Sequence, residues 1–454
     1  MSAAAATLRR AGESVQLRGP AEIRGCIEAP GDKSISHRAA IMNGLARGRA
    51  TVSNYSPGAD CLSTLACLRE LGVGVEQSEA GRRAGPTVSI AGTGGRLTEP
   101  IRPLDAGNSG TTMRLLAGVL AGQQILSVLV GDASLSARPM GRIVVPLRQM
   151  GARVLGRRGG ELAPLVIDGG SLHGIDYVAP VASAQIKSCL LLAGIQADRL
   201  TTVRAPAASR DHTERLLRAQ GASVVEDGAT VTVQGAAELM AVDVEVPGDF
   251  SSAAYWLALG CSHPHAQVEV QNVGINPTRT SFLDILSEMG GEVEVVGQRE
   301  VAGEPRADLR ARSSRLRGVA VGGDLVPRAI DELPLVAILG LFASGVTEIR
   351  DAAELRVKES DRIGSLAREL TRLSARVEEL SDGLRVEGGR RLEAAECESY
   401  GDHRLAMSLA IAGLAGPGIV IRGAGCVGIS YPEFWDHARV LGAIVNDLEP
   451  GACH

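Results

Sequence analysis

One helix-end pattern occurs six times in the chain, and this repetition constrains the fold more than any other feature. Each copy has a leucine-containing helix end, then a glycine or serine, then a short run rich in β-branched residues. The copies are LRELGVGV (68–75), LRQMGARV (147–154), LRAQGASV (217–224), LSEMGGEV (286–293), LTRLSARV (370–377) and ARVLGAIV (438–445). Glycine after the last helical turn is typical of a left-handed C-cap. Self-similarity at a nearly fixed spacing predicts six repeats of one supersecondary unit.

Each repeat also has a second helix that is apolar nearly all round, which is typical of a buried helix. These helices lie in KSISHRAAIMNGLA (33–46), NSGTTMRLLAGVLA (108–121), SAQIKSCLLLAGI (183–195), DFSSAAYWLALG (249–260), DELPLVAILGLFASG (331–345) and DHRLAMSLAIAGLAG (402–416). Most begin with Asp, Asn or Ser, the preferred N-cap residues. Short Val- and Ile-rich segments between the helices predict strands. The predicted class is therefore α/β, with one helix of each repeat inside and one outside.

Two related turns divide the six repeats into two groups of three. PGDKSISHR (30–38) and PGDFSSAAY (247–255) share Pro-Gly-Asp and a serine, but only the first carries basic residues. A chain of 454 residues is too long for one ordinary core and divides into domains. We predict one discontinuous domain from 1–30 plus 247–454, a second domain from 31–246, and an active site in the cleft between them.

Composition excludes several functional classes. The formal charge of −5 argues against a general nucleic-acid binder. Eight cysteines without metal or redox spacing indicate small core residues in a reducing compartment. No apolar run approaches the roughly 20 residues of a membrane span, and the start MSAAAATLRR predicts a disordered tail rather than a signal peptide. We expect a cytoplasmic protein without nucleic-acid or membrane partners.

Basic and polar residues gather at the starts of the predicted buried helices. A helix N-terminus binds anions through its free N–H groups and partial positive charge, and a base placed there opposes helix stability. Repeated departures from a local rule indicate function. The residues concerned are Lys33, Ser34 and Arg38, the segment 107–114, Ser183, Gln185 and Lys187, and His403 and Arg404, with Arg138, Arg142, Arg210, Lys358 and Arg362 at other predicted loops and helix starts.

Asp331 and Glu359 are acids among these bases, a combination that suits general acid–base chemistry on a strongly anionic small molecule. The alternative for Ser34 is a capping serine beside solvated bases, and the alternative for Asp331 is a helix cap. The segment 107–114 could be an ordinary turn, and the acids after Arg210 could be a simple capping pair. No phosphate-loop motif is present, and His263 and His265 have no clustered partners. We expect no metal and no organic cofactor.

Eight motifs in order give the chain a family resemblance. They are PGDKSISHR, GNSGTTMR, RPMGR, SAQIKS, RDHTE, IDELP, LRVKESDR and GDHRLAMS. Over about residues 15–445 the chain resembles the 5-enolpyruvylshikimate-3-phosphate synthases, or 3-phosphoshikimate 1-carboxyvinyltransferases, and especially their class II. The resemblance implies a two-domain enolpyruvyl transferase fold of six βαβαββ units. It also implies transfer of the enolpyruvyl group of phosphoenolpyruvate to the 5-hydroxyl of shikimate 3-phosphate, with release of phosphate, on the route to chorismate and aromatic amino acids.

The resemblance also implies site residues. Asp331, Glu359 and Lys33 would be catalytic, Asp331 as the base on the 5-hydroxyl and Glu359 as the proton donor to the methylene carbon. Shikimate 3-phosphate would be held by Lys33, Ser34, Arg38, Ser183, Ala184, Gln185, Ser209, Arg210, Asp331 and Lys358. Phosphoenolpyruvate would be held by Lys33, Asn108, Gly110, Arg138, Gln185, Arg362, His403 and Arg404.

Three positions depart from the family pattern. Many members have a serine at Ala184, and some have an asparagine near Glu354 and a lysine near Ile429. Gly110 stands where a glyphosate-tolerant class II member has alanine, so we expect glyphosate to inhibit this protein. A monomer is expected, because one chain supplies both predicted domains.

Two other interpretations were weighed. A related enolpyruvyl transferase acts on UDP-N-acetylglucosamine, but it has Lys-Asn in the first motif and commonly a loop cysteine. Here Ser34 follows Lys33, and residues 107–142 contain no cysteine. A non-catalytic anion-binding repeat protein would not need Asp331 and Glu359 among the bases.

Overall fold

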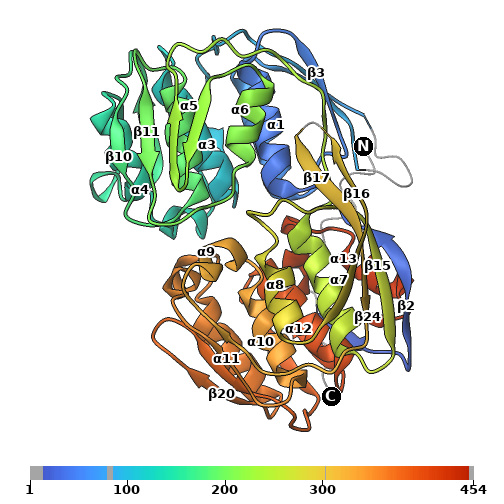
Figure 1. Cartoon of the computed structure of the whole chain (residues 1–454). Helices are drawn as coiled ribbons and strands as arrows, with labels where there is room; N and C mark the ends of the chain where they lie inside the picture. Colours follow the sequence, from blue (N-terminus) through green and yellow to red (C-terminus); the bar gives the residue numbers. More distant parts are fainter. Residues whose placement is uncertain (1–13, 79–84, 302, 449–454) are drawn as a thin grey trace. The chain divides into compact units, whose positions relative to one another are not determined.

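The computed structural model describes residues 14–78, 85–301 and 303–448 (Figure 1). The tail predicted at the start of the chain lies outside these residues. Contacts divide the chain into two compact units. Unit 1 comprises residues 1–30, 247–299 and 305–454, and unit 2 comprises 31–246 together with the short segment 300–304. The chain leaves and re-enters unit 1 at the two Pro-Gly-Asp turns.

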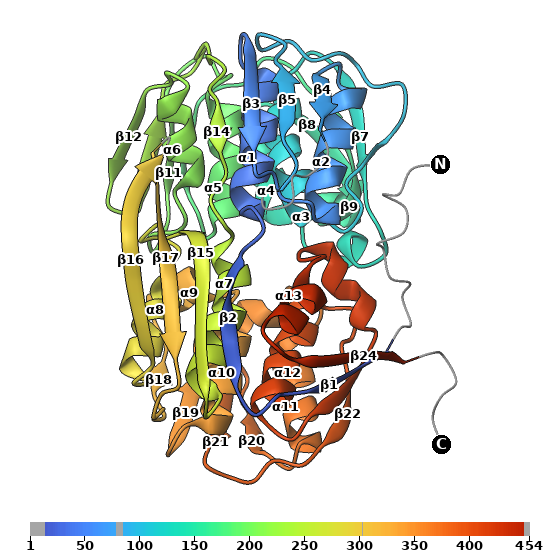
Figure 2. The ribbon, with the colours of Figure 1, turned by 90° about the vertical axis from the view of Figure 1, so that its right-hand side faces the viewer.

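The described residues form six four-stranded sheets, as the six sequence repeats predicted. Unit 2 holds the sheets with strand orders β14-β3-β5-β4, β6-β7-β9-β8 and β10-β11-β13-β12. Unit 1 holds β16-β17-β15-β2, β18-β19-β21-β20 and β22-β23-β1-β24. Each sheet has one parallel pair, such as β6 with β7 or β22 with β23, and antiparallel pairs beside it. Figure 2 shows β3, β5 and β4 side by side in unit 2.

The elements of unit 2 alternate between strands and helices along the chain. Its helices are α1 (Lys33–Leu45), α2 (Ala59–Glu70), α3 (Gly110–Ala121), α4 (Gly141–Gln149), α5 (Ala184–Gly194) and α6 (His212–Ala219). Its strands are β3 (Arg49–Ser53), β4 (Gly74–Gln77), β5 (Val88–Ala91), β6 (Leu104–Asp105), β7 (Leu126–Val130), β8 (Arg153–Arg157), β9 (Leu162–Asp168), β10 (Asp176–Val178), β11 (Thr201–Arg204), β12 (Val224–Asp227), β13 (Thr230–Val233) and β14 (Val244–Glu245).

Unit 1 repeats this alternation, with strands from both ends of the chain. Its helices are α7 (Phe250–Ser262), α8 (Ser281–Glu288), α9 (Leu325–Ala329), α10 (Leu333–Phe342), α11 (Arg362–Arg372), α12 (His403–Ala415) and α13 (Phe434–Val440). Its strands are β1 (Ser14–Arg18), β2 (Ile23–Glu28), β15 (Ala266–Gly274), β16 (Glu292–Val301), β17 (Glu304–Arg312), β18 (Ala320–Val321), β19 (Val346–Ile349), β20 (Arg376–Glu379), β21 (Leu384–Glu387), β22 (Ala395–Glu398), β23 (Ile419–Arg422) and β24 (Ile444–Leu448). The turn between β16 and β17 belongs by its contacts to unit 2.

The six helix-end motifs fold alike. Each contains the end of an outer helix and the start of a strand: α2 and β4, α4 and β8, α6 and β12, α8 and β16, α11 and β20, and α13 and β24. In five of them the glycine after the helix has a φ between +83° and +100°, and Ser374 takes the same place with a φ of +63°. A left-handed residue ends the helix and directs the chain into the strand. The predicted caps are confirmed.

The apolar helices form the cores. In unit 2, α1, α3 and α5 are buried over almost their whole length, and α3 contacts both α1 and α5. In unit 1, α7, α10 and α12 contact one another and are buried to the same degree. Figure 1 shows the sheets outside these helices within each unit. Each buried helix begins directly after a polar N-cap residue, in the polar segments noted in the sequence.

An aromatic cluster marks the core of unit 1. Trp256 of α7 stacks on Phe434 of α13 with ring centroids 4.8 Å apart, and its Nε1 donates a 2.9 Å hydrogen bond to the hydroxyl of Tyr431. Tyr255 and Trp435 contact Phe434 edge-on. All five side chains are buried. The chain has only two tryptophans, five tyrosines and four phenylalanines, and this cluster contains both tryptophans.

No helix among the described residues is long and apolar enough to cross a membrane.

Candidate active site

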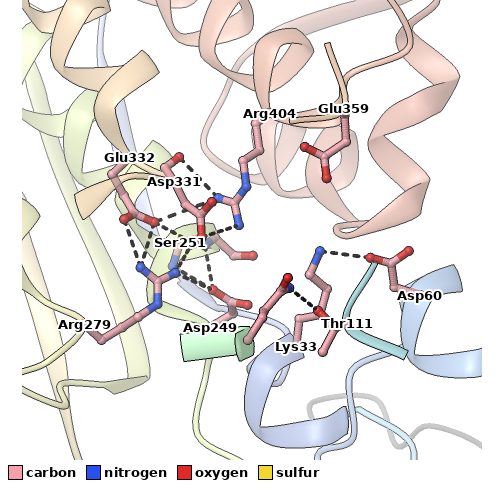
Figure 3. A network of polar contacts seen from close by, with 12 residues as sticks. Lys33, Asp60, Thr111, Asp249, Ser251, Arg279, Asp331, Glu332, Glu359 and Arg404 are labelled. Atoms are coloured by element: carbon pink, nitrogen blue, oxygen red, sulfur yellow. Dashed lines mark hydrogen bonds and ion pairs between the residues drawn. The ribbon is translucent and has the colours of Figure 1, made fainter. Parts of the chain in front are cut away.

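Lys33 stands at the first turn of α1, as predicted. The helix is capped by Asp32, whose carboxylate accepts a 2.8 Å hydrogen bond from the amide of Ile35. The ammonium of Lys33 lies 3.0 Å from Oδ2 of Asp60 at the start of α2 (Figure 3). The Lys33 side chain is 17% exposed, so the ammonium is held in position and still reaches solvent.

Arg38 lies deeper in unit 2. It is buried, and its three guanidinium nitrogens donate to Thr213, to the backbone carbonyl of Ser34 and to Ser188, at 2.7, 2.9 and 2.8 Å. Burial lowers the pKa of Arg38 to about 10, and Glu214 acts in the opposite direction. The predicted anion ligand is therefore also a cross-link between α1, α5 and α6.

A buried chain of hydroxyl groups joins three helix starts in unit 2. Nδ1 of His37 lies 2.6 Å from the hydroxyl of Thr64, which lies 2.6 Å from that of Thr112, and Thr112 donates at 2.8 Å to Ser109. Burial, together with Lys33, holds the pKa of His37 well below its usual value. The imidazole is therefore neutral, and it adds no charge beside Lys33.

The start of α3 brings two predicted phosphoenolpyruvate ligands together. Oδ1 of Asn108 accepts a 2.7 Å hydrogen bond from Arg138, while its amide donates at 2.7 Å to Asp132. A Cβ on Gly110 would lie 2.9 Å from Nη1 of Arg114 and 3.4 Å from Nη1 of Arg138. Gly110 therefore lets two guanidinium groups approach the first turn of α3. Arg114 was not predicted as a site residue, although its fourth position after Gly110 places both on one helix face.

The start of α5 contains the predicted Ser-Ala-Gln segment. Ser183 caps the helix by accepting a 3.5 Å hydrogen bond from the amide of Ile186. The side-chain amide of Gln185 donates to Thr111 at 3.1 Å, and its oxygen accepts from Arg114. Gln185 thereby connects α5 to α3. Ala184 begins the helix with no side-chain donor.

A buried ion pair fixes the loop that contains Ser209 and Arg210. The ammonium of Lys187 lies 2.5 Å from Glu214 and donates to the backbone carbonyl of Ser209 at 3.2 Å. Among described residues, the buried Ser209 hydroxyl has no hydrogen-bond partner within the chain. Arg210 acts electrostatically on Arg38, whose pKa it lowers. The structure thus brings Ser209 and Arg210 near the helix starts of unit 2.

Arg362 is the centre of the candidate site in unit 1. Its buried guanidinium donates to Asp402 through Nε at 2.8 Å and to Glu359 through Nη2 at 2.5 Å, and Nη1 lies 3.9 Å from Asp331. Burial alone would lower the pKa of Arg362, but Asp402 and Glu359 outweigh it and raise the pKa. The two predicted catalytic acids therefore share one cation.

Asp331 also faces Arg404, at the start of α12. Nη2 of Arg404 lies 3.7 Å from Oδ2 of Asp331, and Nη1 donates to the Asp331 backbone carbonyl at 3.4 Å (Figure 3). Asp402 caps α12 by accepting from the amide of Arg404 at 2.9 Å. Burial would raise the pKa of Asp402, but Arg362 outweighs it, so the pKa is lowered and the cap stays ionised.

The remaining predicted residues of unit 1 lie around this centre. Lys358 follows the short helix Ala353–Val357; burial lowers its pKa, with Asp331 and Glu354 acting in the opposite direction. At position 354, near Lys358, this chain thus has the acid Glu354, where some family members have an asparagine nearby. His403 is buried at the start of α12. Ile429 ends the short helix Ala424–Ile429 and offers no charge.

Sequence analysis missed a second buried network in unit 1. Arg279, between β15 and α8, pairs with Glu332 at 2.9 Å, and both lie beside Ser251 of α7 (Figure 3). Glu332 is adjacent to Asp331, and the motif IDELP contained the signal. Arg279 stands in a loop, NPTRTS (276–281), whose pattern carries no sign of burial.

The described residues contain no cluster of three or more histidine, cysteine or acidic side chains that could hold a metal ion.

The fold identifies a class of protein. The chain superposes on an enolpyruvyl transferase from Streptomyces tendae, NikO, with a TM-score of 0.77 over 96% of this chain and 99% of that one. At 19% sequence identity the likeness shows the fold alone. The six small sheets around buried helices are therefore those of the enolpyruvyl transferase fold, as predicted.

The family follows from closer matches. Residues 17–438 match the family described as EPSP synthase (3-phosphoshikimate 1-carboxyvinyltransferase). A 3-phosphoshikimate 1-carboxyvinyltransferase of Synechococcus sp. (strain JA-3-3Ab) is 54% identical over 417 residues, or 91% of this chain and 93% of the relative. An EPSP synthase from Acinetobacter baumannii superposes with a TM-score of 0.84 at 40% identity, covering 96% of this chain and 100% of that one. The chain belongs to the EPSP synthase family.

Proposed function

We propose that this chain transfers the enolpyruvyl group of phosphoenolpyruvate to the 5-hydroxyl of shikimate 3-phosphate and releases phosphate. The observation that carries this proposal is that Asp331 and Glu359 both face the same buried cation, Arg362. Two acids held by one guanidinium are constrained relative to each other, as a base and a proton donor acting on one pair of reactants require. Family membership supports the same reaction.

Each step of the reaction has a residue of suitable chemistry. Glu359 gives a proton to the methylene carbon of phosphoenolpyruvate, which makes C2 electrophilic. Asp331 takes the proton of the 5-hydroxyl as its oxygen forms a bond to C2. The Glu359 carboxylate then takes a proton back from the new methyl group of the tetrahedral intermediate, the carbon–carbon double bond forms again, and the C2–O bond to phosphate breaks. Lys33 and Arg404 stabilise the negative charge of the leaving phosphate, and Lys358 binds shikimate 3-phosphate.

We assign the helix starts of unit 2 to the substrate anions. Ser34, Arg38, Ser183, Gln185, Ser209 and Arg210 would bind shikimate 3-phosphate, and Asn108, Gly110 and Arg138 would bind phosphoenolpyruvate. Helix N-termini with nearby arginines are suited to phosphate and carboxylate groups. The acids lie in unit 1, so we propose that residues of both units act on the same substrates.

The direct test uses the purified chain with phosphoenolpyruvate and one acceptor at a time. Phosphate release with shikimate 3-phosphate, and an equal amount of 5-enolpyruvylshikimate 3-phosphate, are expected. UDP-N-acetylglucosamine should support no release. Release with the sugar nucleotide alone, or ligand binding without turnover of either acceptor, contradicts the proposal.

Three further properties belong to this proposal. Glyphosate is expected to inhibit, because Gly110 leaves space beside Arg114 and Arg138. A monomer is expected, because one chain carries all assigned residues. The cytoplasm is the proposed location, since the cysteines lack disulfide spacing and the reaction supplies a biosynthetic route. Unchanged turnover at glyphosate concentrations far above those of the substrates contradicts the first of these.

A further inference from the structure

Arg279 and Glu332 form a buried ion pair behind the candidate base. Nη1 of Arg279 donates to both carboxylate oxygens of Glu332, at 3.0 and 2.9 Å. The Arg279 side chain is 3% exposed and that of Glu332 is 1% exposed. A pair removed from water in this way leaves a strong uncompensated charge when either partner is lost. Neither Arg279 nor Glu332 is among the predicted site residues.

The start of α7 fixes the pair in place. The hydroxyl of Ser251 donates to Glu332 at 2.5 Å and accepts a hydrogen bond from Nη2 of Arg279 (Figure 3). Asp249 caps α7 through the amides of Ser251 and Ser252 and lies 3.8 Å from Arg279. The second Pro-Gly-Asp turn, 247–255, has no counterpart of Lys33 or Arg38, but its residues Asp249 and Ser251 bind the guanidinium of Arg279.

Glu332 connects this network to the site. It follows Asp331 in the chain and stands at the start of α10. Arg404 approaches both acids, with Nη1 3.9 Å from Glu332 and Nη2 3.7 Å from Asp331. The guanidinium of Arg404 is thereby shared between a buried acid and the candidate base.

The charge of Arg279 also acts on Asp331. Burial alone would lower the pKa of Arg279, but Glu332, Asp249 and Asp331 together raise it. Other charged groups that face Asp331 are Arg362 from α11, Arg404 from α12 and Lys358 from the segment before α11. Asp331 is thus surrounded by cations, and Glu332 is the neighbouring acid that offsets two of them.

We propose that Arg279 and Glu332 are positioning residues that orient Arg404 and set the basicity of Asp331. This inference rests on the proposed function, in which Asp331 takes the proton of the acceptor hydroxyl. Without Glu332, Arg279 and Arg404 would both act on Asp331, stabilise its ionised form and make it a weaker base. Without Arg279, the charge of Glu332 would lose its closest cation and favour the protonated form of Asp331.

The test compares the pH dependence of kcat for Glu332→Gln and Arg279→Gln. Protonation of the base lowers kcat, so the acidic limb of the pH profile of kcat reports the pKa of that base in the bound complex. We expect the limb to move to lower pH in Glu332→Gln and to higher pH in Arg279→Gln, by about 0.5 to 1 unit each. We also expect kcat to fall about tenfold in each, since small misplacements are costly. The double variant should bring the limb back toward the wild-type position.

Glu348→Gln is the matched control. Glu348 lies on β19 of the same unit, and its ion pair with Arg350 is partly exposed. Its pH profile should equal that of the wild type. Limbs of both single variants at the wild-type position, or moved in the same direction, overturn the inference. If neither single variant folds by circular dichroism, Ser251→Ala decides, because it loosens Glu332 without changing charge. A kcat at least about threefold lower with an unmoved limb supports the inference, and an unchanged kcat overturns it.

The two proposals fail differently. Absence of wild-type turnover with shikimate 3-phosphate contradicts the proposed function. Wild-type turnover together with unshifted variants contradicts only the positioning role of Arg279 and Glu332.

Discussion

Lys33 and Arg38 lie five residues apart in α1, and their surroundings differ. Lys33 is partly exposed and has one ion-pair contact at 3.0 Å, whereas Arg38 is buried and donates to three partners. A sequence motif assigns both to the same ligand. The structure separates a partly solvated side chain from a buried one that cross-links three helices.

Replacing Arg38 with alanine should therefore reduce stability as well as activity. The change leaves Thr213 and Ser188 with a lost donor and removes three hydrogen bonds, so we expect the free energy of unfolding to fall by about 2–4 kcal/mol. Lys33→Ala should cost about 1–2 kcal/mol at most, because its pair is partly solvated, while nearly abolishing turnover. Urea denaturation and phosphate-release kinetics measure both. Equal stability of the two variants, or a normal rate in Lys33→Ala, contradicts the assignment.

Asp331→Ala should nearly abolish turnover and leave the chain folded. The side chain is the proposed base, and the cations beside it keep other acidic partners in the variant: Arg404 keeps Glu332 at 3.9 Å, and Arg362 keeps Asp402 at 2.8 Å. Single-turnover measurements and circular dichroism separate the two effects. A wild-type rate in this variant excludes Asp331 as the base.

Gly110→Ala should weaken both phosphoenolpyruvate binding and glyphosate inhibition. The new methyl group would lie 2.9 Å from Nη1 of Arg114, so that side chain must move and its hydrogen bond to Gln185 is disturbed. We expect a several-fold higher KM for phosphoenolpyruvate, since one misplaced guanidinium affects binding by about 1–2 kcal/mol. Gly170→Ala is the control, because its Cβ would meet no atom within 4 Å. Equal glyphosate inhibition of Gly110→Ala and wild type contradicts this prediction.

Sequence motifs found the residues at helix starts because those residues break a local rule that can be recognised without a structure. Arg114, Arg279 and Glu332 break no such rule. Arg114 stands inside a helix, Arg279 in a polar loop, and an acid at position 332 suits the start of α10. Their importance comes from burial and from partners distant in the sequence, such as Ser251 for Arg279, and only the folded chain shows these.

At the scale of elements, the helix ends were predictable and the sheet order was not. A left-handed C-cap is specified by a few neighbouring residues, so all six recurred as expected. The place of β1 between β23 and β24 depends on pairing over more than 400 residues. The addition of the two-residue strand β14 to the edge of β3 depends on pairing over 192 residues, from Val244 to Val52. Such pairings follow from tertiary packing, and the local pattern carries little sign of them.

The hydroxyl chain that joins α1, α2 and α3 predicts a pH dependence of stability. The pKa of His37 is lowered in the folded protein by burial and by Lys33, whereas in the unfolded chain it is near 6.5. Below pH 6.5 the His37 imidazole binds a proton in the unfolded state and stays unprotonated in the folded state. The contribution of His37 is therefore complete above about pH 7 and is lost as the pH falls through 6.5 and below.

His37→Gln should consequently show a flatter decline in unfolding free energy between about pH 7 and pH 5 than the wild type. The variant is expected to be less stable at pH 8, since it disturbs the bond to Thr64, and the difference should shrink toward acid pH. Guanidinium or urea titrations at several pH values measure this. Parallel pH curves for the two proteins would show that His37 does not titrate on unfolding.

At the scale of the whole molecule, a chain of net charge −5 places the buried cations Lys187, Arg362 and Arg404 in the first turns of helices. A ligand that binds the folded protein alone stabilises it by about 2.7 kcal/mol at 100 times its Kd. We expect shikimate 3-phosphate to raise Tm by several degrees, and shikimate at the same concentration to raise it much less, because it lacks the phosphate. Differential scanning calorimetry measures both shifts. Equal shifts would show that the proposed phosphate ligands do not bind that group.

The repeat count and fold class were predictable at this scale, since self-similarity in the sequence reports directly on architecture. The allocation of the segment 300–304 to unit 2 was not. It rests on contacts such as the 2.9 Å pair of Glu304 with His212 and the 2.7 Å hydrogen bond from Arg215 to the carbonyl of Gly303. A hairpin turn carries no sequence sign of the body on which it packs.

The aromatic cluster has a spectroscopic consequence. Both tryptophans of the chain, Trp256 and Trp435, lie in unit 1 and are buried against Phe434. Selectively excited tryptophan fluorescence therefore reports the loss of structure in unit 1, and melting of unit 2 leaves that emission largely unchanged. Circular dichroism sees both. A fluorescence transition that coincides with the dichroism transition would show the two units unfolding as one cooperative body, whereas separated transitions would resolve them without any added label.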